Sequence, residues 1–480
     1  MPILKNKILI YVATRFITYA LQFILSLAIA VRLGPFYLGV YGMVNLVISY
    51  FGQVNFGVPH ALNIFLIHNK DNRLIGDQYS HNALVLYTYQ NLIIVVGAIV
   101  VGLFGWTKWG DYDLGKYLPV ILLTSVLTYY NSVLTTIVRV RNEVNTLSVI
   151  GSISVLLNLC IVWFYKEEAL VYALACVGLL SCIITIVICI RKGVLPQKQS
   201  RVLHVEKQKA IIKKGLFLFL YNSCFYFILI TIRTIISANY SVVEFGYFTF
   251  SFTIANAVML LLNSFNTILF PKTIDLMSSD DNEKKTVLLE KIRIGYISTS
   301  HMLVYLAMLC FPILVWLIPK YEPTLTSMNM TALAVLMNAN SYGYSNMLMA
   351  QNKERKAGMI SMVSLIFNIL IGLLLAKVIR VDYSYIIIAT LIANMISSYL
   401  MALEGDAILR GGKNIVYTLK HFFPVRMFIP YLVALTISCL QLEWLIFIPL
   451  LVFVVLNHKD LKQLKNIALK FIKKPEVIDV

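Results

Sequence analysis

Apolar stretches long enough to cross a lipid bilayer recur from one end of this sequence to the other. A transmembrane helix needs about 20 mostly apolar residues, and the stretch "ILIYVATRFITYALQFILSLAIAV" (8–31) satisfies this with one charged residue. Of all residues, 59% are hydrophobic and 13% are charged, whereas about 25% are charged in typical soluble domains. The sequence therefore predicts an all-α polytopic membrane protein.

We predict about fourteen transmembrane helices. The last two are short and separated only by "QLE", so a single merged hairpin is an alternative there. The predicted spans are 9–31, 37–66, 83–105, 117–138, 146–165, 168–190, 214–237, 244–270, 293–318, 325–350, 358–379, 383–402, 425–440 and 442–457.

The basic residues indicate the orientation of these spans. Cytoplasmic loops of membrane proteins are enriched in lysine and arginine. With the N-terminus inside, the inner segments and span ends hold 32 of the 41 basic residues, and the outer segments hold seven. We therefore predict that both termini are cytoplasmic. The net charge of +18 then reflects membrane topology, and we expect no nucleic-acid partner.

A weak internal repeat predicts two related halves. "YLGVYGMV" opens the second span and "VEFGYFTF" the eighth, with Gly39 and Gly246 207 positions apart. Basic hairpins end the fourth and tenth spans, with Glu143 and Glu354 211 positions apart. Because each half has six spans, the repeats run parallel about an axis along the membrane normal.

This repeat divides the chain into five predicted parts. They are an N-terminal lobe of spans 1–6 (1–190), a cytoplasmic linker (191–213), a C-terminal lobe of spans 7–12 (214–402), two extra spans (403–457) and a cytoplasmic amphipathic tail (458–480). The longest outer loop has about twelve residues, which is too small for the acceptor site of a membrane-embedded glycan polymerase or ligase.

Polar residues at helical spacing mark the first span. Arg15, Tyr19 and Gln22, with Thr14, Thr18 and Ser26, form one polar stripe. An arginine facing lipid would cost at least about 2.5–3.5 kcal/mol, and a water-filled cavity relieves that cost. Because Arg15 lies near the cytoplasmic end, its side chain reaching the inner interface is the alternative.

The seventh span carries a similar stripe, in which Asn222 is the counterpart of Arg15 by the repeat offset. Arg233 belongs to this stripe but lies near the outer end, so a cavity position and an interfacial position both fit. His60 follows Pro59, which should kink the second span, and His301 lies at a similar depth in the ninth.

Asn338 and Asn340, in "NANSYGYSN" of the tenth span, complete the candidate substrate-binding residues. Their amides suit sugar hydroxyls, and joining helices is the alternative. The two histidines likewise fit either a binding role or hydrogen-bonded packing between helices.

Acidic residues are missing from the middle of every predicted span: Glu143, Glu168, Glu244, Asp382 and Glu404 lie at or near span ends. A carrier of organic cations needs a buried carboxylate, so we expect an anionic substrate with many hydroxyls. The sequence also lacks the phosphate-binding loop G-x-x-x-x-G-K-[ST] and any zinc-ligand spacing.

The stretch "RLGPFYLGVYGMVNLVISYFGQVNFGVPHALNIFLIHNK" (32–70) resembles the second-span signature of Wzx-type O-antigen and capsule flippases. These polysaccharide exporters belong to the multidrug/oligosaccharidyl-lipid/polysaccharide superfamily. The repeat, the basic hairpins after spans 4 and 10 and the extra pair of spans also fit this family.

The resemblance implies a transporter of the bacterial cytoplasmic (inner) membrane that moves an undecaprenyl-diphosphate-linked repeat unit from the inner to the outer leaflet. It implies two six-helix lobes around a central cavity that alternate between inward-open and outward-open states. Arg15 matches, by span and face, the cavity arginines that hold the diphosphate in relatives.

The resemblance further implies membrane lipid, a polysaccharide polymerase and a chain-length regulator as partners. It implies no cofactor, and coupling to an H+ or Na+ gradient stays open. Drug exporters of the superfamily carry acidic residues within the spans, and this sequence departs from them there. The alternative function is an ion-coupled exporter of small anionic or amphipathic compounds on the same fold.

Overall fold

The computed structural model describes residues 2–69, 72–103, 110–141, 143–277, 281–351 and 353–463. Helices account for nearly all of these residues, and the described chain contains no strand. The predicted all-α class is confirmed. The predicted amphipathic tail lies outside the described residues from 464 onward.

The chain forms two compact units. The first comprises Met1–Ser223 with Tyr240–Gly246, and the second comprises Cys224–Asn239 with Tyr247–Val480. The division falls within one long helix, α7, because the amphipathic start of that helix packs on the first unit.

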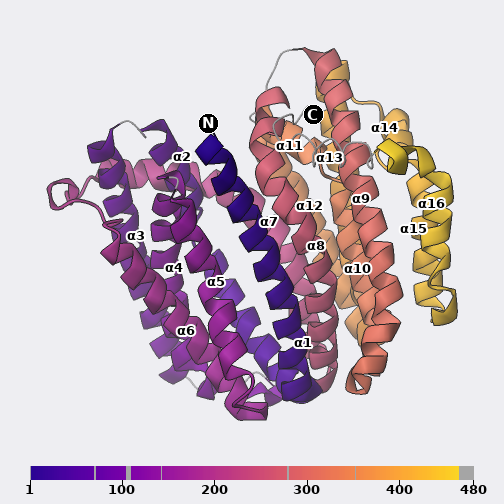
Figure 1. The fold of residues 1–480 in the computed structure, drawn as a ribbon, viewed down its shortest axis with the longest axis horizontal. Helices are drawn as coiled ribbons and strands as arrows, with labels where there is room; N and C mark the ends of the chain where they lie inside the picture. Colours follow the sequence, from indigo (N-terminus) through magenta and orange to yellow (C-terminus); the bar gives the residue numbers. More distant parts are fainter. Residues whose placement is uncertain are drawn as a thin grey trace. The chain divides into compact units, whose positions relative to one another are not determined.

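In the first unit, α6 packs against α1, α4 and α5, and α2 packs between α3 and α4 (Figure 1). Leu62 of α2, Tyr87 of α3 and Val133 of α4 meet in its buried core. The helices are α1 (Pro2–Gln53), α2 (Val58–His68), α3 (Arg73–Leu103), α4 (Leu118–Val140), α5 (Val144–Ile161), α6 (Glu167–Arg191) and α7 (Val205–Asn239).

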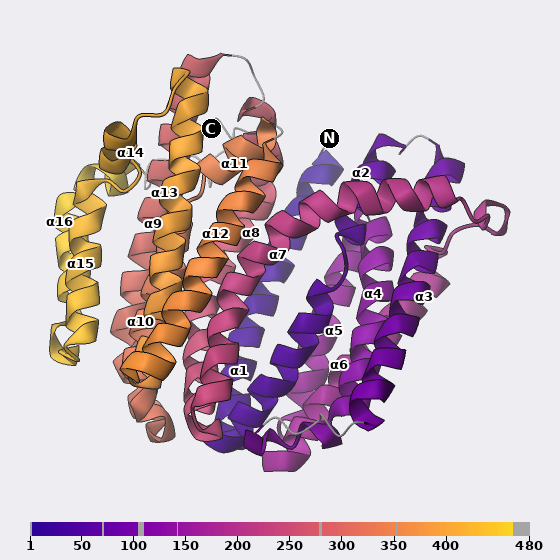
Figure 2. The same ribbon diagram turned by 180° about the vertical axis from the view of Figure 1, so that it is seen from behind.

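The first half of α7 lies across the start of α3 and α2 (Figure 2). The ammonium of Lys207 lies 5.1 Å from the ring centre of Tyr79 in α3. Gly215 of α7 meets Gly57 so closely that a Cβ on either glycine would overlap the other's backbone. This approach fixes α7 where the second predicted span is interrupted.

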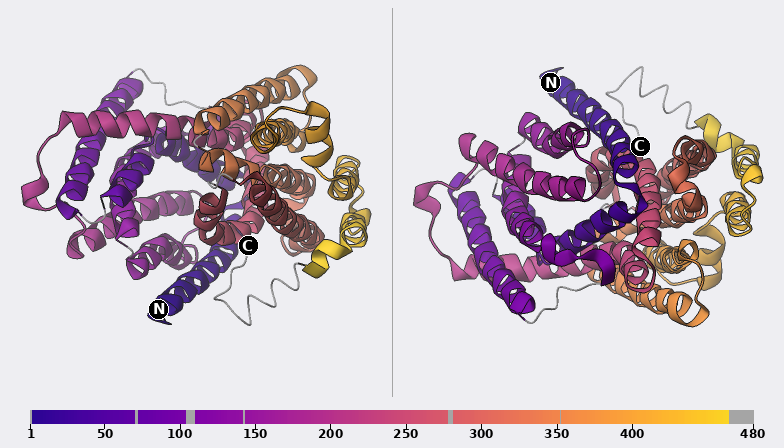
Figure 3. Two further views of the ribbon diagram at one scale, coloured as in Figure 1. Left: turned by 90° about the horizontal axis from the view of Figure 1, so that it is seen from above. Right: turned by 90° about the horizontal axis from the view of Figure 1, so that it is seen from below.

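In the second unit, α10 packs against α9, α13 and α15, and α12 packs against α13. The short pair α15 and α16 forms a hairpin against α10 and α9, at the edge of this unit (Figure 3). The helices are α8 (Val242–Met277), α9 (Asn282–Leu317), α10 (Leu325–Ala339), α11 (Tyr344–Ala350), α12 (Glu354–Leu373), α13 (Ile388–Arg410), α14 (Ile415–His421), α15 (Val425–Cys439) and α16 (Ile448–Leu456).

Every predicted span coincides with helical structure, but three boundaries differ from the prediction. Spans 1 and 2 are joined in α1, which bends at Gly34 (φ 68°) just before Pro35. Span 2 is interrupted at 54–57, where Gly57 has φ 69°. Span 10 is interrupted at 340–343, where Gly343 has φ 89°. Glycine adopts these positive angles without the steric cost that a Cβ imposes.

Seven helices among the described residues are long and apolar enough to cross a membrane as they stand, and the bent α14–α15 pair would make eight. The remaining predicted spans are the shorter or interrupted apolar helices. Trp163, Trp316 and Trp444 are 64%, 76% and 73% exposed at helix ends, as expected of residues in a membrane interface. Trp106 and Trp109 lie outside the described residues. The chain is a multi-pass membrane protein.

The two glycines that mark the sequence repeat meet in the structure. A Cβ on Gly39 would overlap the carbonyl oxygen of Val242, and a Cβ on Gly246 would overlap that of Pro35. Gly39 and Gly246 are 207 positions apart, as are Pro35 and Val242. The repeat thus relates the two contacts to each other, so the contact is self-complementary, as in a two-fold interface. Only glycine permits this backbone approach.

Candidate substrate-binding site

One face of α1 carries the polar stripe predicted from the sequence. Positions 15, 22 and 26 follow one another at near-whole turns of the helix, so they share that face. Gln22 is exposed and Tyr19 is half-buried. Arg15 lies in α1 on this face, and its side chain lies outside the described part of the structure.

The neighbouring Thr18 is different, because it is buried and its hydroxyl lies 3.1 Å from that of Ser152 in α5. This hydrogen bond fixes the flank of the stripe against α5. It leaves the face of Gln22 as the accessible polar face of α1.

His60 lies in the first turn of α2, where its side chain is exposed. The preceding interruption frees backbone carbonyls that cost energy if left without a partner in a membrane. Gln90 of α3 donates to the carbonyl of Val54, and Tyr129 of α4 donates to that of Phe51. Polar residues within spans 3 and 4 thus stabilise the broken span that presents His60.

The α7 stripe is described only in its second half, because the side chain of Asn222 lies outside the described residues. Arg233 is 8% exposed, and its guanidinium lies 5.3 Å from the ring centre of Phe252 in α8. A side chain that snorkels to the interface would be exposed at its tip, so Arg233 is instead held among its neighbours.

Asn338 lies in the last turn of α10 and Asn340 is the first residue of the interruption of span 10, so they do not lie along a continuous helix as expected. Asn338 is half-buried, whereas Asn340 is 1% exposed. The carbonyl of Asn340 accepts a hydrogen bond of 2.8 Å from Arg293. Asn340 therefore lies inside the second unit, and Asn338 is the more accessible of the two.

His301 is fully buried. Its ring lies 3.0 Å from the hydroxyl of Tyr305 and stacks on Phe453 of α16, with ring centres 5.7 Å apart. Its surroundings belong to the contact between α9 and the terminal hairpin. His301 was expected either to bind substrate or to pack between helices. Its position agrees with packing, because the side chain does not reach the accessible surface.

Arg293 is a buried cation that the sequence analysis did not single out. Its guanidinium donates to the carbonyls of Asn340 and Phe422 and lies 4.4 Å from the ring centre of Tyr344. Tyr344 donates to Asp406, which also accepts from Thr418 at 2.7 Å. Burying an unpaired charge costs free energy, so the guanidinium of Arg293 can be buried only because these partners surround it.

The first unit has a corresponding buried acid, Asp77 of α3. Its carboxylate forms an ion pair of 3.2 Å with Arg141 and accepts from the backbone amide of Gln197. Nearby, Asn82 accepts from the amide of His204 at 2.9 Å and donates to the carbonyl of Val202. The chain after the sixth span is thereby attached to α3.

Asp77 precedes its predicted span and Arg293 is the first residue of its predicted span, so the apolar runs marked neither as buried. Both helices continue beyond their apolar segments. Helix α3 begins at Arg73 although its apolar span begins at 83, and α9 begins at Asn282 although its span begins at 293. Apolar runs locate the part of a helix inside the bilayer but not its extensions. Both extensions lie on the side rich in basic residues.

The structure places the nine candidate residues in both units. Arg15, Tyr19, Gln22, His60 and Asn222 belong to the first, and Arg233, His301, Asn338 and Asn340 belong to the second. Acidic residues of the described helices lie toward helix ends, including Asp77 and Asp406. Among the described residues, no group of three or more His, Cys, Asp or Glu side chains could hold a metal ion.

The fold is that of several MATE proteins of known structure. Over 82% of this chain and 94% of the other, it matches the inward-facing conformation of a multidrug resistance MATE family transporter of the MOP superfamily, with a TM-score of 0.70 and 14% identity. The outward-facing conformation of such a transporter matches with a TM-score of 0.61 and 15% identity, over 85% and 96% of the two chains.

A further match is a MATE protein in complex with MaL6, with a TM-score of 0.62 and 14% identity, over 85% and 96% of the two chains. No protein-family model and no curated protein matches the sequence. The chain therefore has a MATE-like fold, and two of these structural neighbours are described as multidrug resistance transporters.

Proposed function

We propose that this protein is a lipid-linked oligosaccharide flippase of the bacterial inner membrane, with both termini in the cytoplasm. It moves an undecaprenyl-diphosphate-linked O-antigen or capsule repeat unit from the inner to the outer leaflet by alternating access. A cationic cavity holds the diphosphate while the polyprenyl tail stays in lipid.

The observation that carries this proposal is the polar face of α1. Gln22 is exposed and Tyr19 is half-buried on the face to which position 15 belongs, within a helix otherwise apolar enough for a bilayer. A guanidinium binds phosphate oxygens through paired, charge-assisted hydrogen bonds. The exposed amide of Gln22 and the half-buried phenol of Tyr19 suit the hydroxyls of a sugar.

The distribution of acidic residues supports an anionic substrate. The described helices carry their carboxylates toward their ends, where Asp77, Asp406 and Glu404 are paired with basic or hydroxyl groups. A carboxylate in the middle of the membrane, which would attract organic cations and repel a diphosphate, is not among the described residues. We propose that polymerase and chain-length regulator act on the product outside.

A second candidate is an ion-coupled exporter of small anionic or amphipathic compounds. The observation that favours it is the fold, because the similar solved structures include multidrug resistance transporters. Deleting the gene separates the two: loss of surface polysaccharide supports the flippase, and increased drug sensitivity with normal polysaccharide supports the exporter.

The direct test at residue level is Arg15→Ala. We expect loss of surface polysaccharide at unchanged protein level, because the diphosphate loses its cation, and partial activity in Arg15→Lys, which keeps the charge but not the paired donors. Arg32→Ala is a matched control, since Arg32 lies just before the bend of α1 at Gly34, with its guanidinium 5.5 Å from the ring centre of Trp163. Full activity of Arg15→Ala would refute the assignment.

A further inference from the structure

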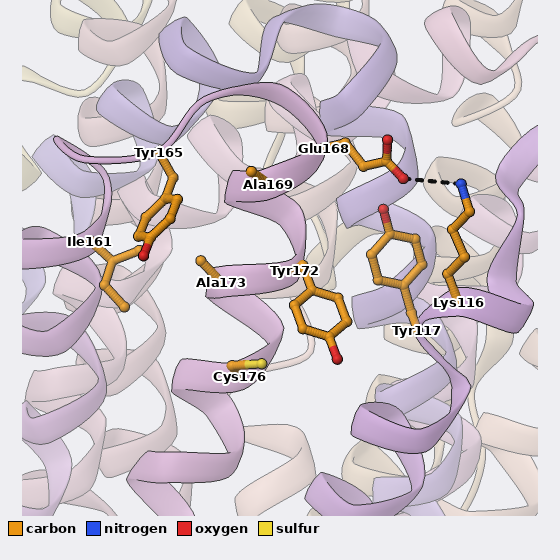
Figure 4. Close-up of a pocket in the computed structure, with 9 residues that line it drawn as sticks. All are labelled: Lys116, Tyr117, Ile161, Tyr165, Glu168, Ala169, Tyr172, Ala173 and Cys176. Carbon is orange, nitrogen blue, oxygen red and sulfur yellow. Dashed lines mark hydrogen bonds and ion pairs between the residues drawn. The ribbon is translucent and has the colours of Figure 1, made fainter.

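A groove of about 740 Å³ lies in the first unit, where the ends of α4, α5 and α6 meet (Figure 4). Lys116 and Glu168 lie at one end of it, and the side chains along α6 continue through Tyr172 and Ala173 to Cys176. The groove is independent of the polar face of α1.

One end of the groove is charged. The ammonium of Lys116 lies 2.8 Å from the carboxylate of Asp113 and 3.1 Å from that of Glu168. One cation and two anions give this cluster a net charge of −1. The side chains of Lys116 and Glu168 remain 57% and 53% exposed, so a ligand can reach both.

The rest of the groove is apolar. Tyr117 and Tyr172 form one wall with ring centres 6.3 Å apart, and Ala173 and Cys176 leave space between them because their side chains are small. Beyond the groove, α6 exposes the large apolar residues Leu180, Ile183, Val187 and Ile190 before Arg191 ends the helix. The groove therefore opens on a helix face whose exposed side chains match acyl chains.

We propose that this groove binds an aminophospholipid, one with a phosphate and a primary ammonium in its headgroup. The phosphate binds Lys116 and the ammonium binds Glu168 and Asp113, while the start of an acyl chain lies along Ala173 and Cys176. The groove lies at the helix ends on the side of the protein that is poor in basic residues. Because that side is predicted to face outward, the bound lipid belongs to the outer leaflet. Exposed Trp163, at the same helix end, marks the interface level.

The charges and the lining select this occupant. An anionic headgroup without an ammonium would bring negative charge to a cluster that already has a net charge of −1, at a distance where like charges repel. A sugar lying along Ala169, Ala173 and Cys176 would bury hydroxyls against side chains that offer them no strong hydrogen-bond partner, which costs energy for each unpaired group. A zwitterionic lipid avoids both costs: its headgroup pairs with the charged end of the groove, and its acyl chain covers the apolar part.

Native mass spectrometry of the purified full-length protein tests the proposal. The protein is released from nanodiscs that contain phosphatidylethanolamine and phosphatidylglycerol in equal amounts, and the retained lipid is counted. We expect phosphatidylethanolamine to be retained in about three- to fivefold excess, which is the range of an exposed ion pair. Equal retention of the two lipids, or protection of the groove by a free oligosaccharide, would overturn the proposal.

Two variants locate the lipid. Glu168→Lys changes the net charge of the cluster from −1 to +1, so the preference should invert toward phosphatidylglycerol. Ala173→Trp fills the groove and should abolish selective retention, whereas Val149→Trp adds the same bulk to an exposed position of α5 and should not. A preference unchanged in Glu168→Lys contradicts the assignment even if Ala173→Trp fails to fold. The flippase proposal survives either result.

Discussion

Arg293 shows how a single buried charge can hold an interrupted membrane helix together. The break at 340–343 frees backbone carbonyls, and the guanidinium satisfies that of Asn340 while also binding Phe422 beyond α14. The planar group has five donors in a fixed arrangement, which suits several carbonyls at once. One residue of α9 thus connects α10, α11 and the start of the terminal hairpin.

Removing this guanidinium should destabilise the protein. In Arg293→Met, two buried carbonyls lose their donor, which costs about 1–3 kcal/mol each. The stability of Arg293→Lys should lie between those of Arg293→Met and the wild type, because an ammonium reaches fewer acceptors than a guanidinium. Thermal unfolding in detergent measures the effect. The exposed neighbour Lys291 provides the control Lys291→Met, which should unfold with the wild type. Equal unfolding temperatures for Arg293→Met and wild type would contradict this role.

Among the elements, the crossing of α1 with the first turn of α8 depends on two glycines. Gly39 and Gly246 each lie against a carbonyl oxygen of the other segment, and a larger residue at either position must push the helices apart. Because the two positions are related by the sequence repeat, each should be equally sensitive.

We expect Gly39→Leu and Gly246→Leu to lower the unfolding temperature and to abolish transport. The control is Gly97→Leu in α3, where an added Cβ meets no atom within 4 Å. Unfolding temperature and surface polysaccharide should both stay near wild type in that control. Normal polysaccharide in Gly246→Leu would show that the close crossing is not required.

The sequence predicts elements better than it predicts contacts between them. Apolar length identified helical structure at every predicted span, since the bilayer fixes the number of residues that a helix needs. It did not reveal that span 10 breaks at Gly343, because a glycine within an apolar run signals no particular backbone angle. Nor did it reveal Arg293 or Asp77, whose burial depends on helices that continue past the apolar segments. The repeat, by contrast, correctly marked Gly39 and Gly246 as special.

At the scale of the whole molecule, the asymmetric distribution of basic residues predicts which ends of the helices face the cytoplasm. Lys198 lies in the segment between α6 and α7, on the side rich in lysine and arginine, and Lys320 lies after α9, on the opposite side. Both side chains are exposed.

Single cysteines at these positions, in a protein whose seven native cysteines are replaced by serine or alanine, test the topology. A membrane-impermeant maleimide added to intact cells that lack an outer membrane barrier should label Lys320→Cys, whereas Lys198→Cys should react only after the membrane is opened. Labelling of Lys198→Cys in intact cells would reverse the orientation and place the lipid groove in the inner leaflet.

Transfer of a diphosphate-linked glycan between leaflets can be measured with the purified protein in proteoliposomes. A fluorescent polyprenyl-diphosphate oligosaccharide is quenched from outside, and the fraction that becomes accessible over time measures transfer. We expect transfer by the wild type, none by Arg15→Ala, and faster transfer under a pH or Na+ gradient if the protein is ion-coupled. Vesicles in which the glycolipid stays in its leaflet while a small amphipathic anion is exported would refute the flippase function.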